Sequence, residues 1–179
     1  SGEQLRSRQA MQFGCAPDFN AYEQGHPLRM INPESLETDE GAWRLAGGHV
    51  HLGYDKERVG VPEFVVAAFC DATLGLWMVG RDKQGIRRET YGSAGRYRPK
   101  PYGIEYRTLS NSWTFRSTVA QGVAIRAISV CEWLENSDTR TIRSAYGEIQ
   151  WGDVRAAINN EDVVRAENLM HFINTTIGL

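Results

Sequence analysis

One apolar helix limits the folds open to this sequence more than any other segment. Residues from Glu63 to Val79 are mainly apolar and contain no interior proline, and Pro62 stands where a first helical turn is expected. A helix of that composition has to be buried. Strand-like segments flank it along the chain, from Ala46 to Tyr54 and from Ile104 to Ser110. These segments predict a sheet backed by the buried helix.

A second helix is expected directly after the later strand, from Ser112 to Leu134, with Asn111 as its N-cap. Its apolar side chains recur at helical spacing and include Phe115, Val123 and Val130. Such a stripe indicates a second helix that packs on the core.

The order of these elements predicts the fold class. Strands and helices do not alternate regularly, as they would in a parallel doubly wound sheet, so the sequence favours an α+β fold with a curved antiparallel sheet backed by helices. Two or three shorter helices are expected in the tail, with Asn159 or Asn160 capping a helix from Glu161 to Ile173. A length of 179 residues suits one domain, residues 1–179.

Composition excludes several classes of partner. The chain is 41% apolar and 23% charged with a net charge of −2, so no general basic field attracts nucleic acid or an anionic membrane. The longest apolar run, Phe64 to Cys70, is too short to span a bilayer. Three cysteines, Cys15, Cys70 and Cys131, lack C-x-x-C spacing. We therefore expect a cytoplasmic protein without disulfides. The sequence does not decide its oligomeric state, and a homo-oligomer is one of the possibilities.

The two strands carry polar side chains at alternate positions. Because side chains in a strand alternate between faces, His49 and His51 share one face, and so do Glu105 and Arg107. If the strands are neighbours, one sheet face holds two imidazoles, a carboxylate and a guanidinium. Such a set suits a metal ion together with a polyphosphate.

The H-x-H pattern alone is a weak signal, because most such pairs are surface or partly buried histidines. Here Gly47 and Gly48 precede it and permit close approach by a ligand or another strand. Imidazole and carboxylate are common ligands of divalent metals, so we expect His49 and Glu105 to bind Mg²⁺ or Mn²⁺.

The basic residues of note gather in one stretch around the second strand. They are interleaved with tyrosines and glycines, which is atypical of a solvated face, although a plain surface role stays open. Arginine offers a planar fork that matches carboxylate or phosphate, so the cluster predicts binding of a nucleotide triphosphate. Neither a P-loop nor a G-x-G-x-x-G motif is present. The cluster comprises Arg88, Arg96, Arg98, Lys100 and Arg107.

Two loops are expected to contribute. The segment from Arg87 to Tyr97 combines basic, aromatic and glycine residues and is interpreted as a loop that wraps an anion, with the residues up to Lys100 continuing it. Upstream, a long loop carries Asp18 and Asn20, which either line a site or cap turns.

Three motifs together resemble a known family. They are FGCAPDFNAY from Phe13, AGGHVHLGY from Ala46, and RRETYGSAGRYRPKPYGIEYRTLSN from Arg87. In this combination they are similar to the phage-type carboxylate–amine ligases (COOH-NH2 ligase type 2), relatives of glutamine synthetase and glutamate–cysteine ligase, over about Phe13 to Trp113. The resemblance implies a glutamine-synthetase-like fold and an ATP- and Mg²⁺-dependent enzyme. It would join a small-molecule or peptide carboxylate to an amine through an acyl phosphate, in the host cytoplasm if it is phage-encoded.

The resemblance also implies roles for single residues. His49 and Glu105 would bind metal, and His51 would contact metal or ATP phosphate. Arg107 would hold phosphate or the substrate carboxylate. Arg98 would hold phosphate, and Arg88 and Lys100 are further candidates for binding ATP.

One departure from the family keeps alternatives open. Relatives carry acidic metal ligands in a segment before the FGCAPDFNAY motif, so this chain would be the C-terminal, larger part of the catalytic domain. A non-catalytic binding or structural protein on the same scaffold is one alternative. A cupin-like metal enzyme, which also uses H-x-H and a glutamate, is a second, although the two long helices argue against an all-β jelly roll.

Overall fold

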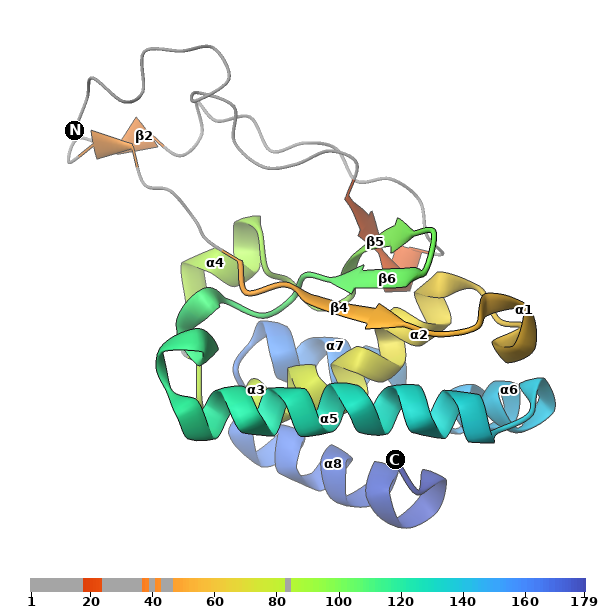
Figure 1. Cartoon of the computed structure of the whole chain (residues 1–179). Coiled ribbons are helices and arrows are strands. Elements are labelled where there is room, and N and C mark those ends of the chain that lie inside the picture. Colours follow the sequence, from red (N-terminus) through yellow and green to blue (C-terminus); the bar gives the residue numbers. More distant parts are fainter. Residues whose placement is uncertain (1–17, 24–36, 39–40, 43–46, 83–84) are drawn as a thin grey trace.

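A computed structural model describes residues 18–23, 37–38, 41–42, 47–82 and 85–179 (Figure 1). The short elements in the first third are β1 (Phe19–Asn20), η2 (Ala21–Glu23), β2 (Glu37–Thr38) and β3 (Gly41–Ala42). The middle holds β4 (Val50–Gly53), α1 (Lys56–Val59), α2 (Glu63–Cys70), η4 (Asp71–Gly75), α3 (Leu76–Met78), α4 (Gly85–Thr90), β5 (Arg96–Lys100) and β6 (Gly103–Tyr106). The last part contains η5 (Asn111–Phe115), α5 (Ser117–Asn136), α6 (Thr139–Glu148), α7 (Trp151–Asn159) and α8 (Val163–Ile177).

The described strands confirm the α+β class. β1, β5, β6 and β4 form, in that order, a four-stranded sheet in which every pair is antiparallel. The two predicted strand segments are neighbours, since His51 lies opposite Glu105 in the β4–β6 register. An isolated bridge between Gly47 and Ser110 extends this pairing. Helix-rich architecture of this kind is not a jelly roll, so the cupin alternative lacks its scaffold.

The segment that carries Arg96 to Lys100 is a strand, not the loop that the sequence indicated. Pro99 lies inside it, and proline normally argues against a strand because it cannot donate a ladder hydrogen bond. β1 pairs only with Arg96 and Tyr97, so among the described residues Pro99 has no strand partner opposite β6, and proline is tolerated there. The prediction of a loop from Arg87 to Tyr97 was also wrong at its start, because α4 covers Gly85–Thr90.

The buried apolar helix is confirmed and contains a π turn. α2, η4 and α3 follow one another from Glu63 to Met78, with Pro62 at the N-cap one residue before the first turn. Most side chains of this segment are buried. Its α2 part packs on β5 and β6, under the apolar face of the sheet.

The second helix begins later than predicted. Ser110, not Asn111, caps the 3-10 turn η5, because its hydroxyl accepts from the Ser112 amide at 3.0 Å. The backbone leaves helical geometry at Arg116 before α5 starts. Phe115 therefore lies outside the helical stripe and is exposed, whereas Val123, Val130 and Leu134 of α5 are buried.

Three helices complete the chain, as expected, but a different residue caps the last one. The Asp162 carboxylate accepts from the Arg165 amide at 3.0 Å and starts α8, whereas Asn159 and Asn160 end α7. Figure 1 shows α2, α5, α7 and α8 on one side of the four-stranded sheet.

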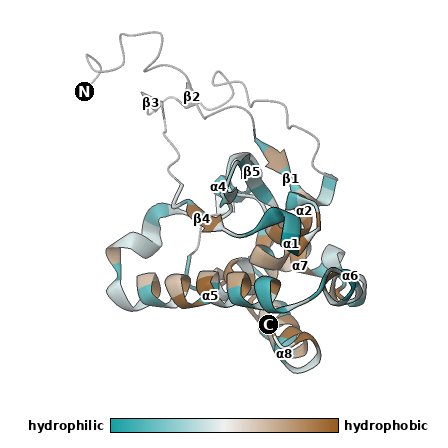
Figure 2. Ribbon diagram, turned by 45° about the vertical axis from the view of Figure 1, so that its right-hand side comes forward, coloured by the Kyte–Doolittle hydropathy of each residue, from teal (hydrophilic) through white to brown (hydrophobic). Residues whose placement is uncertain are grey.

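Hydropathy follows this arrangement. Figure 2 shows hydrophobic and hydrophilic turns alternating along α5, as expected of a helix that covers a core on one side only. Within the ranges described above, none of the helices combines the length and apolar character that crossing a membrane requires.

Candidate functional site

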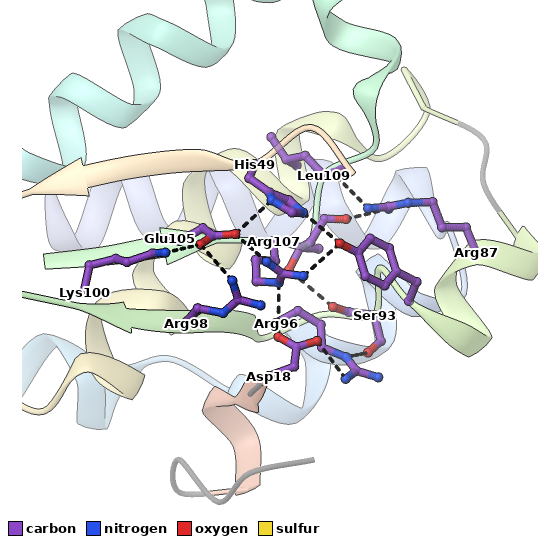
Figure 3. Close-up of polar contacts among 12 residues, drawn as sticks. Asp18, His49, Arg87, Ser93, Arg96, Arg98, Lys100, Glu105, Arg107 and Leu109 are labelled. Carbon is purple, nitrogen blue, oxygen red and sulfur yellow. Dashed lines mark hydrogen bonds and ion pairs between the residues drawn. The ribbon is translucent and has the colours of Figure 1, made fainter. Parts of the chain in front are cut away.

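The face of the sheet opposite α2 is charged (Figure 3). Glu105 of β6 is the Cα partner of His51 on one side and of Arg98 on the other. Because strand side chains alternate, Arg96, Arg98 and Lys100 of β5 share this face. Register thus gathers residues that are far apart in the sequence around one carboxylate.

Glu105 lies at the centre of this face and is 4% exposed. Its Oε2 is 2.7 Å from Lys100 Nζ and 3.5 Å from Arg98 Nη1. Its Oε1 is 2.9 Å from His49 Nδ1 and also accepts from Arg107 Nη1. Burial alone would raise the pKa of Glu105, but the Lys100 hydrogen bond and the nearby guanidinium groups outweigh it and lower the pKa to about 2. Glu105 is therefore a carboxylate at neutral pH.

The side chains of Glu105, His49, Tyr91 and Arg107 form a closed ring of polar contacts on this face. Arg107 Nη2 donates to the Tyr91 hydroxyl at 2.8 Å, and that hydroxyl is 2.9 Å from His49 Nε2. The ionised Glu105 can only accept, so His49 carries its proton on Nδ1 and accepts from Tyr91 at Nε2. Burial and the charge of Arg107 lower the pKa of His49 from 6.5 to about 4, which keeps the imidazole neutral.

Asp18 extends the ring toward β1. Its Oδ1 lies 3.2 Å from Arg107 Nε, and its Oδ2 lies 3.2 Å from Arg96 Nη1. The first contact is an ion pair without hydrogen-bond geometry. Arg96 Nε also donates to the Ser93 hydroxyl at 3.0 Å. Burial raises the pKa of Asp18, although both arginines act in the opposite direction. Of the two roles that the sequence left open for Asp18, this arrangement favours lining the site.

The charges on this face do not balance. Among the described residues of this face, Arg96, Arg98, Lys100 and Arg107 carry four positive charges, whereas Asp18 and Glu105 carry two negative ones, and His49 is neutral. Two positive charges are left over within a partly buried surface, where screening by water is weak. The face is therefore built to attract an anion.

The predicted metal set does not assemble as three ligands. His51 is exposed, and its Nδ1 is 2.5 Å from the Tyr102 hydroxyl. Both nitrogens of His49 already have protein partners. In the part of the chain that the structure describes, no three His, Cys, Asp or Glu side chains are grouped to hold a metal ion. His49 and Glu105 alone are too few for Mg²⁺, which prefers six oxygen ligands.

Arg88, a predicted ATP-binding residue, is directed elsewhere. Its Nη1 donates to the carbonyl oxygens of Gly92 at 2.8 Å and Thr108 at 3.1 Å, and the residue is buried. Arg87 likewise donates to the carbonyl oxygens of Thr108 and Leu109, at 2.8 and 2.6 Å. Both guanidiniums thus hold the segment directly after β6 in place, because α4 turns them toward its backbone.

Two residues of this region were not predicted. Tyr91 joins Arg107 to His49, and nothing in the sequence distinguished it from its neighbouring tyrosines. Asp71 lies behind the sheet, where the hydroxyl groups of Tyr22 and Tyr106 donate to it. Its signal was available, since it is the only charged residue between Phe64 and Val79.

The fold and site define a class: an α+β protein with a cation-rich face on an antiparallel sheet. The family model of the phage phiEco32-like COOH-NH2 ligases, type 2, matches residues 29–156. The chain belongs to this ligase family, as its motifs indicated. No curated protein and no solved structure matches it. The glutamine-synthetase-like fold is thus an expectation from the resemblance alone.

Proposed function

We propose that this chain is an ATP-dependent carboxylate–amine ligase whose charged sheet face binds phosphate and carboxylate groups. Membership of the ligase family supports the reaction class. The observation that carries the proposal is the surplus of two positive charges among the described residues around Glu105 and Asp18, because two of the three substrates of such a reaction, ATP and the acid, are anions.

The reaction divides into two steps. A carboxylate oxygen of the acid substrate attacks the γ-phosphorus of ATP, the bond to the bridging oxygen breaks, and ADP leaves. The amine then attacks the carbonyl carbon of the acyl phosphate, inorganic phosphate leaves with the bonding electron pair, and the nitrogen loses a proton. Protein groups mainly position the reactants and neutralise charge in such a phosphoryl transfer.

The residues of the face have distinct roles in this proposal. Arg98 and Lys100 would bind ATP phosphates, because both lie on β5 beyond the residues that pair with β1. Arg107 would hold the transferred phosphate or the substrate carboxylate, and its planar fork suits either anion. Glu105 would keep these cations apart and oriented while no ligand is bound.

Mg²⁺ or Mn²⁺ fits this face only in part. His49 and Glu105 would be its protein ligands, with Nε2 of His49 made available by movement of Tyr91. When bound, the ion would neutralise phosphate charge. The described residues supply too few free oxygens to hold it unaided, so further ligands would have to come from phosphates or from other acidic residues.

The test measures ATP binding by calorimetry and ADP release with panels of amino acids, other acids and polyamines. Arg107→Lys keeps the charge but cannot reach Asp18, Glu105 and Tyr91 together, so turnover should fall by ~10²-fold or more. Arg143→Lys, the same change at an exposed position of α6, is the matched control and should not alter turnover.

Glu105→Gln tests the centre of the charged face. Glu167→Gln, the same change at an exposed position of α8, is its matched control. The amide donates where the carboxylate accepted, so metal-dependent turnover should be lost while thermal melting shows a folded protein. ATP binding without any turnover would instead favour the non-catalytic protein on the same scaffold. Parent-like turnover in both site variants would show that the reaction takes place elsewhere.

A further inference from the structure

A buried carboxyl group lies behind the charged face. Asp71 is fully buried in the π turn η4. It accepts from the Tyr106 hydroxyl at 2.5 Å, from the Tyr22 hydroxyl at 2.7 Å and from the Thr108 hydroxyl at 3.2 Å. The Gly95 amide also donates to it. Its partners are thus donors from three separate segments, and none of them is a cation.

Two of these donors flank Arg107 in the sequence. Tyr106 and Thr108 point toward the helices because side chains alternate, whereas Arg107 between them points to the charged face. Fixing both neighbours fixes the position and tilt of the Arg107 backbone. Asp71 therefore sets, from the opposite face of the sheet, where the guanidinium can reach.

The third donor controls the partner of Arg107. Tyr22 lies in η2, directly after β1, and the same short segment begins with Asp18. The Ala21 amide also bonds to the Gly95 carbonyl oxygen at 2.9 Å, next to the Gly95 amide that donates to Asp71. Asp71 thus holds in place the backbone segments that carry both members of the Arg107–Asp18 ion pair.

The helix is shaped to allow this contact. A π turn is wider than an α turn and commonly marks a functional position. A Cβ atom on Gly75 would lie 2.8 Å from the Tyr106 hydroxyl and 3.2 Å from Asp71 Oδ1. Glycine at this position lets the tyrosine reach the carboxylate.

We propose that Asp71 is a positioning residue for the anion site: through the Tyr106, Thr108 and Tyr22 hydroxyls it holds Arg107 and Asp18 at the separation that a bound anion requires. The nature of that anion rests on the proposed function, but the positioning role does not. If the role of Asp71 were purely structural, replacing it would lower the stability of the protein but would leave the guanidinium of Arg107 in its place.

The test observes the Arg107 guanidinium without any ligand. Its Nε–H signal in a ¹H–¹⁵N spectrum is assigned by its loss in Arg107→Lys. In Asp71→Asn this signal should shift by more than a line width, and its hydrogen exchange should accelerate about tenfold. Val130→Ala, a core change at a buried position of α5, should leave both unchanged although it also lowers stability.

Milder variants keep the test decisive if Asp71→Asn does not fold. Tyr106→Phe removes one hydroxyl and should move the Arg107 signal, whereas Tyr22→Phe should chiefly move the Arg96 signal through Asp18. Unchanged arginine signals in folded Tyr106→Phe and Tyr22→Phe would overturn the proposal. A failed ligase assay combined with shifted signals would refute the proposed reaction and leave the positioning role standing.

Discussion

The pH dependence of folding should change when Asp71 is replaced by asparagine. Burial raises the pKa of Asp71 from 3.8 to about 6, although its hydroxyl donors act in the opposite direction. The folded state therefore binds a proton more tightly than the unfolded state does. The stabilisation that this tighter proton binding gives the folded state is complete below about pH 3.8 and is lost as the pH rises through 6.

The size of the effect follows from the shift. A difference of about two pKa units corresponds to ~3 kcal/mol in the free energy of unfolding between pH 3 and pH 8. At pH 5 protonation of Asp71 still contributes ~1.4 kcal/mol more to the free energy of unfolding than it does at pH 8. Asp71→Asn lacks this titration, so the stability difference between parent and variant should change by ~1.4 kcal/mol between these two pH values.

The comparison has to be made between two proteins, because His49 titrates in the same window with opposite sign. Its pKa is lowered from 6.5 to about 4, so its contribution to stability is lost as the pH falls below 6.5. Both proteins contain His49, and its effect cancels in the difference.

Urea unfolding followed by tryptophan fluorescence at pH 5, 6, 7 and 8 gives the required free energies. The chain has five tryptophans as probes. Asp153→Asn, the same change at an exposed position of α7, controls for the substitution itself. A parent-minus-variant difference that stays constant from pH 5 to pH 8 would refute the reasoning, because it would mean that Asp71 does not titrate in this range.

Three further predictions concern packing and metal. Gly48→Ala should lower the free energy of unfolding in urea by ~2 kcal/mol or more, since the new Cβ would lie 2.2 Å from the Ser110 carbonyl oxygen. Gly147→Ala, in α6 with no atom within 4 Å of the new Cβ, should raise it by ~0.5–1 kcal/mol. Cys131→Ala should leave ADP release nearly unchanged and cost about 1 kcal/mol in thermal stability, and a dead variant would indicate thiol chemistry. Calorimetry with Mg²⁺ alone should show weak binding that strengthens with ATP, and tight ATP-independent Zn²⁺ binding would contradict the site.

Periodicity predicted part of this site. The period-two pattern put His49 with His51 and Glu105 with Arg107, and it put all four on one face only if the two strands are neighbours. The structure confirms that condition and has the side chains of His49 and Glu105 2.9 Å apart. The apolar run predicted the buried helix from a local pattern alone.

What the sequence could not predict depends on which segments meet. Arg88 and Arg98 look alike in the sequence, but α4 turns Arg88 to backbone carbonyls while β5 keeps Arg98 on the charged face. The strand β5 was missed because its mixture of basic, aromatic and glycine residues was interpreted as a loop, and only its pairing with β1 and β6 shows that it is a strand. Tertiary pairing, not residue type, decided both cases.

Two buried carboxyl groups near the same strand have pKa values that are shifted in opposite directions. Asp71 and Glu105 are both buried, yet the pKa of Asp71 is raised to about 6 and that of Glu105 is lowered to about 2. The difference lies in their partners, which are neutral donors for Asp71 and cations for Glu105. A group with a pKa near 2 cannot act as an effective base at neutral pH, and His49, near 4, is a poor one. The charged face is therefore suited to hold anions. In the reaction proposed above, the proton that the amine releases would need another acceptor, such as the departing phosphate.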